Sequence, residues 1–254
     1  MEITFNLERF DTLVPGLGEE TPEDLHEVIG TEGDRYRDGF TRACLYLVAK
    51  SPADSYGEVI AIGTEYGNTA ALLGLQREAM AKGKLLSPQY FPSATSSSAA
   101  AFLSMRIGAT GGNFTVNAGP LTAMIAFWQA LSALHYHRSS ASRLLVGDVY
   151  CPEALADAEK DAPDLACESG MTHARFTPGT QLSARFQFGP PSAGQGNRLH
   201  ARRYGRNAAF AMAAFLRAAQ DLTCGQSVTL ESRGGEVQIT RHDDPTFDIR
   251  RSTV

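Results

Sequence analysis

The sequence lacks the features that mark secreted, metal-binding and membrane-spanning proteins. Only four cysteines occur among 254 residues, and they form neither a C-x-x-C pair nor a zinc-ligand spacing. No apolar run reaches the ~18 residues of a membrane span. The acidic opening Met1–Thr4 has neither the basic flank nor the apolar run of a signal peptide. We therefore expect reduced thiols, no metal ion, no cofactor and a cytoplasmic location.

An excess of basic residues is also missing. The chain has 23 Lys and Arg against 28 Asp and Glu, which gives a net charge of −5. This charge provides no electrostatic reason to expect nucleic acid or an acidic membrane as a partner. His135 and His137 lie close in sequence, but their i, i+2 spacing turns the two rings to different faces of a helix. The pair predicts a solvated helix end and not a metal site.

The length and the hydrophobic pattern predict an α/β protein. A chain of this length buries roughly 70% of its unfolded surface, and we expect residues 1–254 to form a single domain. Apolar strands alternate with helices in the first part of the chain. The expected strands are 59–63, 114–118 and 144–149, and the expected helices are 34–50, 69–82, 96–107 and 121–138. This alternation predicts a largely parallel sheet covered on both faces, with the apolar last helix at the centre.

Residues 151–254 have a different pattern, with fewer elements. Alternation, glycine and proline content, and alanine-rich periodicity define the segments. They are a strand at 181–188, a loop at 189–197, a helix at 207–222 and a hairpin with strands at 227–231 and 236–241. The second part is therefore expected to be an abbreviated unit.

One segment carries the most specific motif of the chain. Residues 115–123 read T-V-N-A-G-P-L-T-A, which aligns without a gap with the T-V-S-T-A-C-A-S-G turn of β-ketoacyl synthases. Four further matches follow that family's order and near-family spacing, at 59–67, 86–92, 111–116 and 144–148. The stretch 56–150 therefore resembles the N-terminal half of a β-ketoacyl synthase of the thiolase superfamily.

Pro120 occupies the position of the family's nucleophilic cysteine. Proline has no thiol, amine or acidic proton, so it cannot form the acyl-enzyme. The family's two catalytic histidines are missing as well, because His173, His200 and His242 lack the family's sequence contexts. Its late G-F-G-G-T-N turn is also missing, and Gly234–Gly235 is too short a match to identify it.

The resemblance implies a thiolase-like layered α/β fold with a complete N-terminal half and an abbreviated C-terminal half. Residues 34–150 correspond to the ketosynthase N-terminal-half core, and residues 151–254 form the shortened second half. An alternative remains that Pro120 is only the first-turn proline of a helix in an unrelated α/β protein, since proline suits that position.

Within the family, the resemblance points to a chain-length factor, the thiol-less partner of a catalytic ketosynthase in type II polyketide synthases. The short second half is similar to the small factors of aryl-polyene-type systems. Family members dimerise through the strand before the nucleophile turn. The resemblance therefore implies a heterodimer interface formed by Phe114, Thr115, Val116 and Asn117. A partner subunit should expose such an apolar strand, whereas a stand-alone protein should not.

The resemblance also implies a role in setting product length. The segment after the S-P-x-F-x-P motif lines the partner's acyl tunnel in the family, which places Tyr90, Ala94 and Thr95 at that tunnel. A bulky side chain there stops a growing chain, and a small one lets it pass. For Tyr90, an ordinary half-buried aromatic is an equally good interpretation.

The densest basic cluster follows the glycine-rich loop. It contains Arg198, His200, Arg202, Arg203 and Arg206. One interpretation is a solvated loop that leads into a helix. The other is a docking patch for an acidic acyl carrier protein or its phosphopantetheine.

Two other functions stay open. One is a degenerate ketosynthase relative that acts as a decarboxylase or acyltransferase through another residue. The other is a stand-alone acyl-binding scaffold. Co-purification with a cysteine-bearing ketosynthase would distinguish a partner subunit from both.

Overall fold

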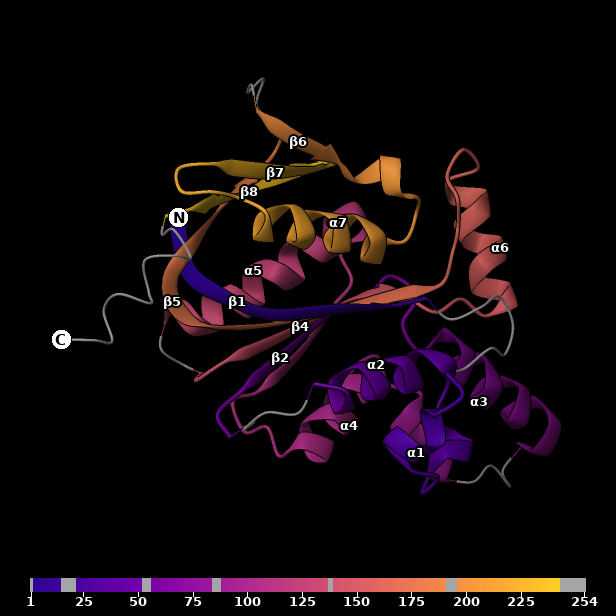
Figure 1. Ribbon diagram of the computed structural model, residues 1–254. Coiled ribbons are helices and arrows are strands. Elements are labelled where there is room, and N and C mark those ends of the chain that lie inside the picture. Colours follow the sequence, from indigo (N-terminus) through magenta and orange to yellow (C-terminus); the bar gives the residue numbers. More distant parts are fainter. Residues whose placement is uncertain are drawn as a thin grey trace.

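The computed structural model contains one eight-stranded sheet with helices on both faces (Figure 1). It describes residues 2–14, 22–51, 56–83, 88–136, 139–190 and 196–242. Leu86, Ser87 and His137, which figured in the sequence interpretation, lie outside the described residues.

The sheet has the order β3-β2-β4-β5-β8-β7-β6, with β1 paired to β5. Its strands are β1 (Glu2–Leu13), β2 (Val59–Gly63), β3 (Asn113–Val116), β4 (Ser142–Asp148), β5 (Gly170–Phe188), β6 (Asn197–His200), β7 (Ser227–Ser232) and β8 (Gly235–Arg241). The α-helices are α1 (Leu25–Ile29), α2 (Gly39–Ala49), α3 (Thr69–Lys82), α4 (Ser98–Ile107), α5 (Thr122–His135), α6 (Pro152–Asp161) and α7 (Ala208–Gln220). Short 3-10 turns are η1 (Asp34–Tyr36), η3 (Pro88–Ser93), η4 (Gly119–Leu121) and η5 (Ala201–Tyr204).

Two hydrophobic cores lie on opposite faces of the sheet. Helices α5 and α7 cover one face, α2 and α4 cover the other, and α1 packs against α2 (Figure 1). Successive residues of β2 face opposite cores, because side chains alternate along a strand. Ala61 belongs to the α5 core, whereas Ile60 and Ile62 belong to the α2 core. The expectation of a sheet covered on both faces is confirmed.

Helix α5 is central, as its apolar sequence predicts. Phe127 on α5 is fully buried. Its ring centroid lies 6.0 Å from that of Phe5, 5.4 Å from that of Phe176 and 6.4 Å from that of Phe215. The four rings join α5 to β1, β5 and α7, so one aromatic cluster connects residues from both ends of the chain.

The three strands from which a largely parallel sheet was expected, β2, β3 and β4, are parallel, but the sheet as a whole is mixed. Only β3, β2 and β4 form a parallel group, and β6 is parallel to β7. Strand β5 is antiparallel to β4, β1 and β8, and β8 is antiparallel to β7. A parallel connection needs a crossover helix that packs on the sheet. Helix α6, between β4 and β5, buries only Ala154 and Ala158, and the chain returns antiparallel.

The first expected helix also differs from its prediction. Residues 34–36 form the separate turn η1, and α2 begins only at Gly39. The Asp38 carboxylate accepts a hydrogen bond from the Thr41 N–H at 2.8 Å. Such a side-chain cap satisfies a free donor at the helix start, which fixes the beginning of α2 after Asp38.

A buried ion pair joins the beginnings of the central strands. Glu58 precedes β2, and its carboxylate accepts from Arg143 Nε of β4 at 2.6 Å and from Arg175 Nε of β5 at 2.8 Å. Neither the Glu58 nor the Arg143 side chain is exposed. Arg175 also pairs with Glu8 of β1, whose side chain is 42% exposed. Four segments of the sheet thus share one charge network.

Glu58→Gln should lower the free energy of unfolding by about 3–5 kcal/mol, because it leaves the buried Arg143 charge without its counter-ion. Glu8→Gln is the matched control, since Glu8 pairs with the same Arg175 from an exposed position. It should cost only about 0–1 kcal/mol. Urea unfolding followed by circular dichroism measures both, and equal losses would contradict the assigned role of the buried pair.

Candidate functional site

The turn at Pro120 connects the edge strand β3 to the central helix α5. Gly119 has a φ of 54°, a left-handed conformation that favours glycine. Pro120 lies in the first turn of η4, where its missing N–H leaves no donor without a partner. The Ala118 N–H donates to Thr122 Oγ1 at 2.8 Å and closes the turn. The sequence therefore forms a strand–turn–helix with no side-chain nucleophile at its tip.

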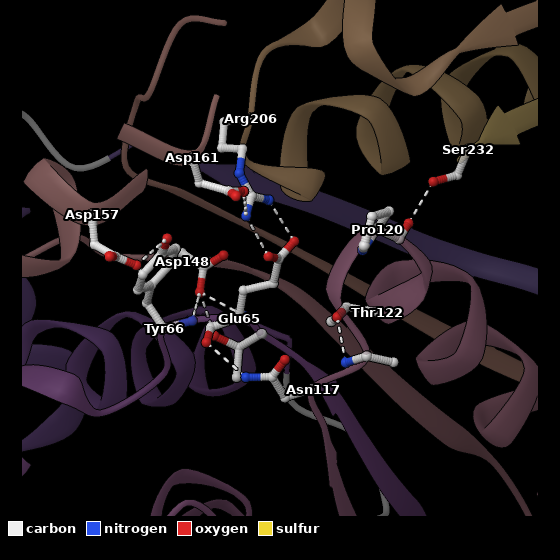
Figure 2. A network of polar contacts seen from close by, with 12 residues as sticks. Glu65, Tyr66, Asn117, Pro120, Thr122, Asp148, Asp157, Asp161, Arg206 and Ser232 are labelled. Carbon is white, nitrogen blue, oxygen red and sulfur yellow. Dashed lines mark hydrogen bonds and ion pairs between the residues drawn. The ribbon is translucent and has the colours of Figure 1, made fainter. Parts of the chain in front are cut away.

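The β7–β8 hairpin lies directly against this turn. The Ser232 hydroxyl donates to the Pro120 carbonyl oxygen (Figure 2). A Cβ placed on Gly234 would lie 3.6 Å from Leu121 Cδ1. The short Gly234–Gly235 segment thus lies beside the turn in three dimensions, although its sequence is too brief to identify.

A cavity of about 320 Å³ opens next to Pro120. Its walls come from the η4 turn, the segment after α6, η5, the start of α7 and the hairpin tip. Among the described residues that line it, there is no cysteine and no histidine. Ser232 is its one hydroxyl-bearing lining residue in the described ranges, and that hydroxyl donates to the backbone. The described lining residues therefore supply no thiol and no imidazole for covalent acyl chemistry.

Arg206 forms one wall of the cavity through ion pairs. Its guanidinium donates to the two carboxylate oxygens of Glu65 at 2.7 and 2.6 Å and to Asp161 at 3.2 Å (Figure 2). The hydrogen bonds to Glu65 raise the pKa of Arg206 above its usual range. A guanidinium that binds both oxygens of one carboxylate forms a strong ion pair with a defined geometry. Arg206 thus fixes the cavity wall and is not a free cation.

Asp148, at the end of β4, holds the loop that carries Glu65. Its carboxylate accepts from Thr64 Oγ1 at 2.5 Å, from the Tyr66 N–H at 2.7 Å and from the Glu65 N–H at 3.0 Å. Burial raises the pKa of Asp148, and the Thr64 and Tyr66 hydrogen bonds oppose that rise. The carboxylate ties the turn after β2 to the end of β4, which sets the position of the Glu65 side chain.

Asn207 positions the segment that contains Arg206. Its side-chain amide donates to the carbonyl oxygens of Asp148 at 2.9 Å, Glu168 at 2.9 Å and Gly170 at 3.1 Å. Its side-chain oxygen caps α7 by accepting from the Ala209 N–H at 3.1 Å. Asn207 was not among the residues singled out from the sequence, although an Asn before an alanine-rich helix is a known capping signal.

Helix α6 is attached to the site by side-chain contacts. Asp157 accepts from the Tyr66 hydroxyl at 3.1 Å, and Asp161 pairs with Arg206. Burial and then the bond to Asp157 raise the pKa of Tyr66 to about 12. The phenol therefore stays protonated and donating at neutral pH, which keeps α6 next to the cavity.

The predicted basic cluster divides into paired and unpaired members. Arg198 of β6 pairs with Glu231 and Glu236, and His200 pairs with Glu231. Arg202 and Arg203 lie exposed in η5, and no carboxylate of the described ranges pairs with either. Arg202 also lines the cavity at Pro120. The basic cluster begins on strand β6, and residue 197, which was expected to lie in the loop 189–197, is the first residue of that strand.

The predicted interface strand forms one edge of the sheet. Within the described part of the chain, β3 pairs only with β2, so its other edge has no partner strand. Phe114 is 44% exposed there. Val116 is half-buried, and the Asn117 amide donates to the Glu65 carbonyl oxygen at 2.8 Å. Thr115 is half-buried as well.

The predicted tunnel residues lie away from the Pro120 cavity. Tyr90 in η3 packs edge-on against Tyr36, with ring centroids 5.4 Å apart. It lines a separate cavity of about 250 Å³ between η1, α3 and η3. Ala94 is half-buried, and the exposed Thr95 binds Ser98 through their hydroxyls at 2.9 Å. None of the three predicted residues is among the described residues that line the Pro120 cavity.

Metal ions and membranes receive no support from the described residues. They contain no group of three His, Cys, Asp or Glu side chains that could hold a metal ion. None of the helices in the described ranges combines the length and apolar character needed to cross a membrane. His173 is buried on β5 outside the cavity lining, and burial lowers its pKa to about 3.

Comparison with known proteins identifies the fold by structure alone. No family model matches the sequence, and no curated protein is similar to it. Many solved structures are similar to this chain, among them three that contain a ketosynthase. A ketosynthase in complex with its chain length factor from Xenorhabdus doucetiae matches with a TM-score of 0.63 and 11% identity, over 94% of this chain and 100% of that chain. The chain has the thiolase-like fold of the ketosynthases.

Two further solved structures agree with this assignment. The ishigamide ketosynthase/chain length factor matches with a TM-score of 0.64 and 14% identity, over 88% of this chain and 86% of that chain. A type II PKS acyl-carrier protein in complex with its hexaketide-bound ketosynthase matches with a TM-score of 0.64 and 12% identity, over 96% and 100%. The thiolase-like α/β fold expected from the sequence is therefore confirmed.

The isolated chain should form no acyl-enzyme, because the turn has Pro120 in place of a nucleophile and no histidine is among the described residues that line its cavity. The chain is incubated with acyl carrier protein thioesters and examined by intact-mass spectrometry, with a cysteine-bearing ketosynthase as the positive control. We expect an adduct on the control only. Pro120→Cys should not give condensation either, since a thiol alone lacks the base. A stoichiometric adduct on any Cys or Ser of the wild-type chain would contradict this.

Proposed function

We propose that the chain is a chain-length factor: a non-catalytic partner of a ketosynthase in type II polyketide or polyene biosynthesis. The observation that carries the proposal is the intact strand–turn–helix of a ketosynthase fold with Pro120 at its tip and no thiol or imidazole among the described cavity residues. Nucleophilic catalysis needs an activated nucleophile with a base in reach. The fold is retained here without that pair, which favours a role in assembly over a role in bond formation.

The edge strand β3 supports pairing with a second subunit. An unpaired strand edge offers a row of backbone donors and acceptors to another chain, and proteins that stay monomeric protect such edges. In the described structure, Phe114 of β3 is exposed beside that open edge. We assign Phe114, Thr115, Val116 and Asn117 to the contact with the ketosynthase.

The surface next to β3 supports the same assignment. Helix α3 has no buried residue among residues 69–82, all of which are described. Exposed large apolar side chains occur on α3, η3, α4 and β3, elements that contact one another in succession. They are Leu72, Met80, Phe91, Met105 and Phe114. Contiguous exposed apolar surface marks protein–protein interfaces, and we propose that the partner covers these side chains.

We further propose that Tyr90, Ala94 and Thr95 line the partner's acyl tunnel. Tyr90 and Ala94 are half-buried and Thr95 is exposed, so a partner that covers η3 would meet these side chains. Tyr90 rests against Tyr36, which gives its ring a defined orientation. A bulky, fixed ring is suited to stop a growing chain.

The ion pairs within the chain reduce the number of arginines that are available to contact an acyl carrier protein. Arg198 and Arg206 already bind carboxylates of this chain, so they offer little free charge. Arg202 and Arg203 are exposed and have no carboxylate partner in the described ranges. We propose that these two arginines contact the acidic carrier protein.

All four cysteines are free, which supports the proposed cytoplasmic location.

Phe114→Asp should abolish co-purification with the cysteine-bearing ketosynthase when the two are co-expressed. An obligate pair buries ~2,000 Å² or more, and an unpaired charge placed in it costs several kcal/mol. Phe188→Asp is the matched control: Phe188 is also exposed, at 51%, but lies at the end of β5. A complex that survives Phe114→Asp, or that Phe188→Asp disrupts equally, would place the interface elsewhere.

Ala94→Phe should shorten the product of the complex, and Tyr90→Ala should lengthen it or broaden its distribution. One side chain in a cavity changes packing by about 1–4 kcal/mol, less than an extensive interface provides. Product length should therefore change while the complex stays intact. Mass spectrometry of the products and gel filtration of the complexes measure the two effects. Wild-type products from both intact complexes would remove the gating role.

A further inference from the structure

The cavity at Pro120 is lined by both apolar and charged residues, with exposed arginines at its rim. Pro120, Leu165, Ala208 and Ala211 supply apolar surface from three separate segments. Arg202 of η5 and Arg233 of the hairpin tip line the same cavity, and both are exposed. This combination suits an amphiphilic molecule whose charged end lies at the rim.

The charges of the cavity favour an anion. Three arginines line it against two carboxylates, Glu65 and Asp161, and both carboxylates bind Arg206. No carboxylate in the described part of the chain pairs with Arg202 or Arg233. These two guanidinium groups therefore have their pairing capacity free, and an arginine fork is suited to an oxyanion.

Two further features of the cavity wall also favour an anionic ligand. Arg206 Nε is buried and has no hydrogen-bond partner among the described residues, although buried donors are normally satisfied. Ala208 is the first residue of the 13-residue helix α7, and the η4 turn leads into the 14-residue helix α5. The positive ends of both helix dipoles therefore face this region. Figure 2 shows Arg206 beside Glu65 and Asp161, and Pro120 beside Ser232.

We propose that this cavity binds a small carboxylic acid without covalent attachment. Its carboxylate pairs with Arg202 and Arg233, and its apolar body lies against Pro120, Ala208 and Ala211. The cavity of about 320 Å³ holds roughly ten water-sized groups, which limits the ligand to a short acid. The site belongs to this chain alone, so the proposal stands whether or not the chain pairs with a ketosynthase.

The test uses the full chain and three probes: hexanoate, the uncharged hexanol and inorganic phosphate. Chemical-shift changes in NMR spectra measure the binding. Hexanoate should bind saturably with a Kd on the order of 1 mM. Hexanol lacks the charge and phosphate lacks the apolar body, so each should bind at least about tenfold more weakly.

Variants locate the site. Arg202→Ala and Arg233→Ala should each weaken hexanoate binding about 2- to 5-fold, and the double variant about tenfold. Arg185→Ala removes an exposed arginine of β5 outside the cavity lining and should leave the Kd unchanged. Ala208→Leu should fill the cavity and remove binding, with thermal unfolding confirming that the variant is folded.

Several results would overturn the proposal. Hexanoate could bind without saturation, hexanol could bind as tightly as hexanoate, or phosphate could bind as tightly as hexanoate. Each result would contradict the proposal, and the last would indicate a simple anion site. Loss of affinity in Arg185→Ala equal to that in the rim variants would also overturn it. Unchanged binding in folded Ala208→Leu would show that the acid binds elsewhere.

Discussion

The backbone pairing of β5 is the constraint on which the rest of the fold depends. Residues 170–176 pair with β4, residues 182–188 pair with β8, and β1 runs along β5 over both stretches. Buried backbone donors and acceptors must find partners, so this one strand fixes how the parallel group and the C-terminal strands share a sheet. Strands β4 and β5 approach each other closely: a Cβ on Gly147 would lie 2.1 Å from the Gly170 carbonyl oxygen. Only glycine fits there.

A chain of hydrogen bonds and ion pairs fixes the segments around Pro120. Asp148 fixes the loop after β2, Glu65 on that loop binds Arg206, and Arg206 holds α6 through Asp161. Each link joins segments that are distant in sequence. In a working enzyme, perturbed charges at such a turn serve the reaction. Here they set the wall of the cavity beside Pro120, which agrees with the structural and binding roles that we propose for it.

The sequence predicted the elements whose hydrophobic pattern is strong. Strand β2, helices α3, α5 and α7 and the β7–β8 hairpin lie where periodicity and glycine placed them. Strand β1 was missed because several of its residues are exposed and polar. The first half of β5 was missed because Pro178 and Gly179 interrupt its pattern. The Pro120 turn was found by its motif. The Glu65–Arg206 pair was not, because its partners lie 141 residues apart and charge density in a sequence does not reveal partners.

The β1–β5 pairing has a consequence for the order of folding. The Gln181 N–H donates to the Asn6 side chain across 175 residues of sequence, and β1 pairs with no other strand of the described sheet. Contacts of such long range form slowly. During synthesis, β1 and the open edge of β4 must both wait for β5 to leave the ribosome, since chains fold from the N-terminus as they emerge. The N-terminal half of the nascent chain therefore exposes the unpaired edges of β1 and β4 until β5 has been synthesised.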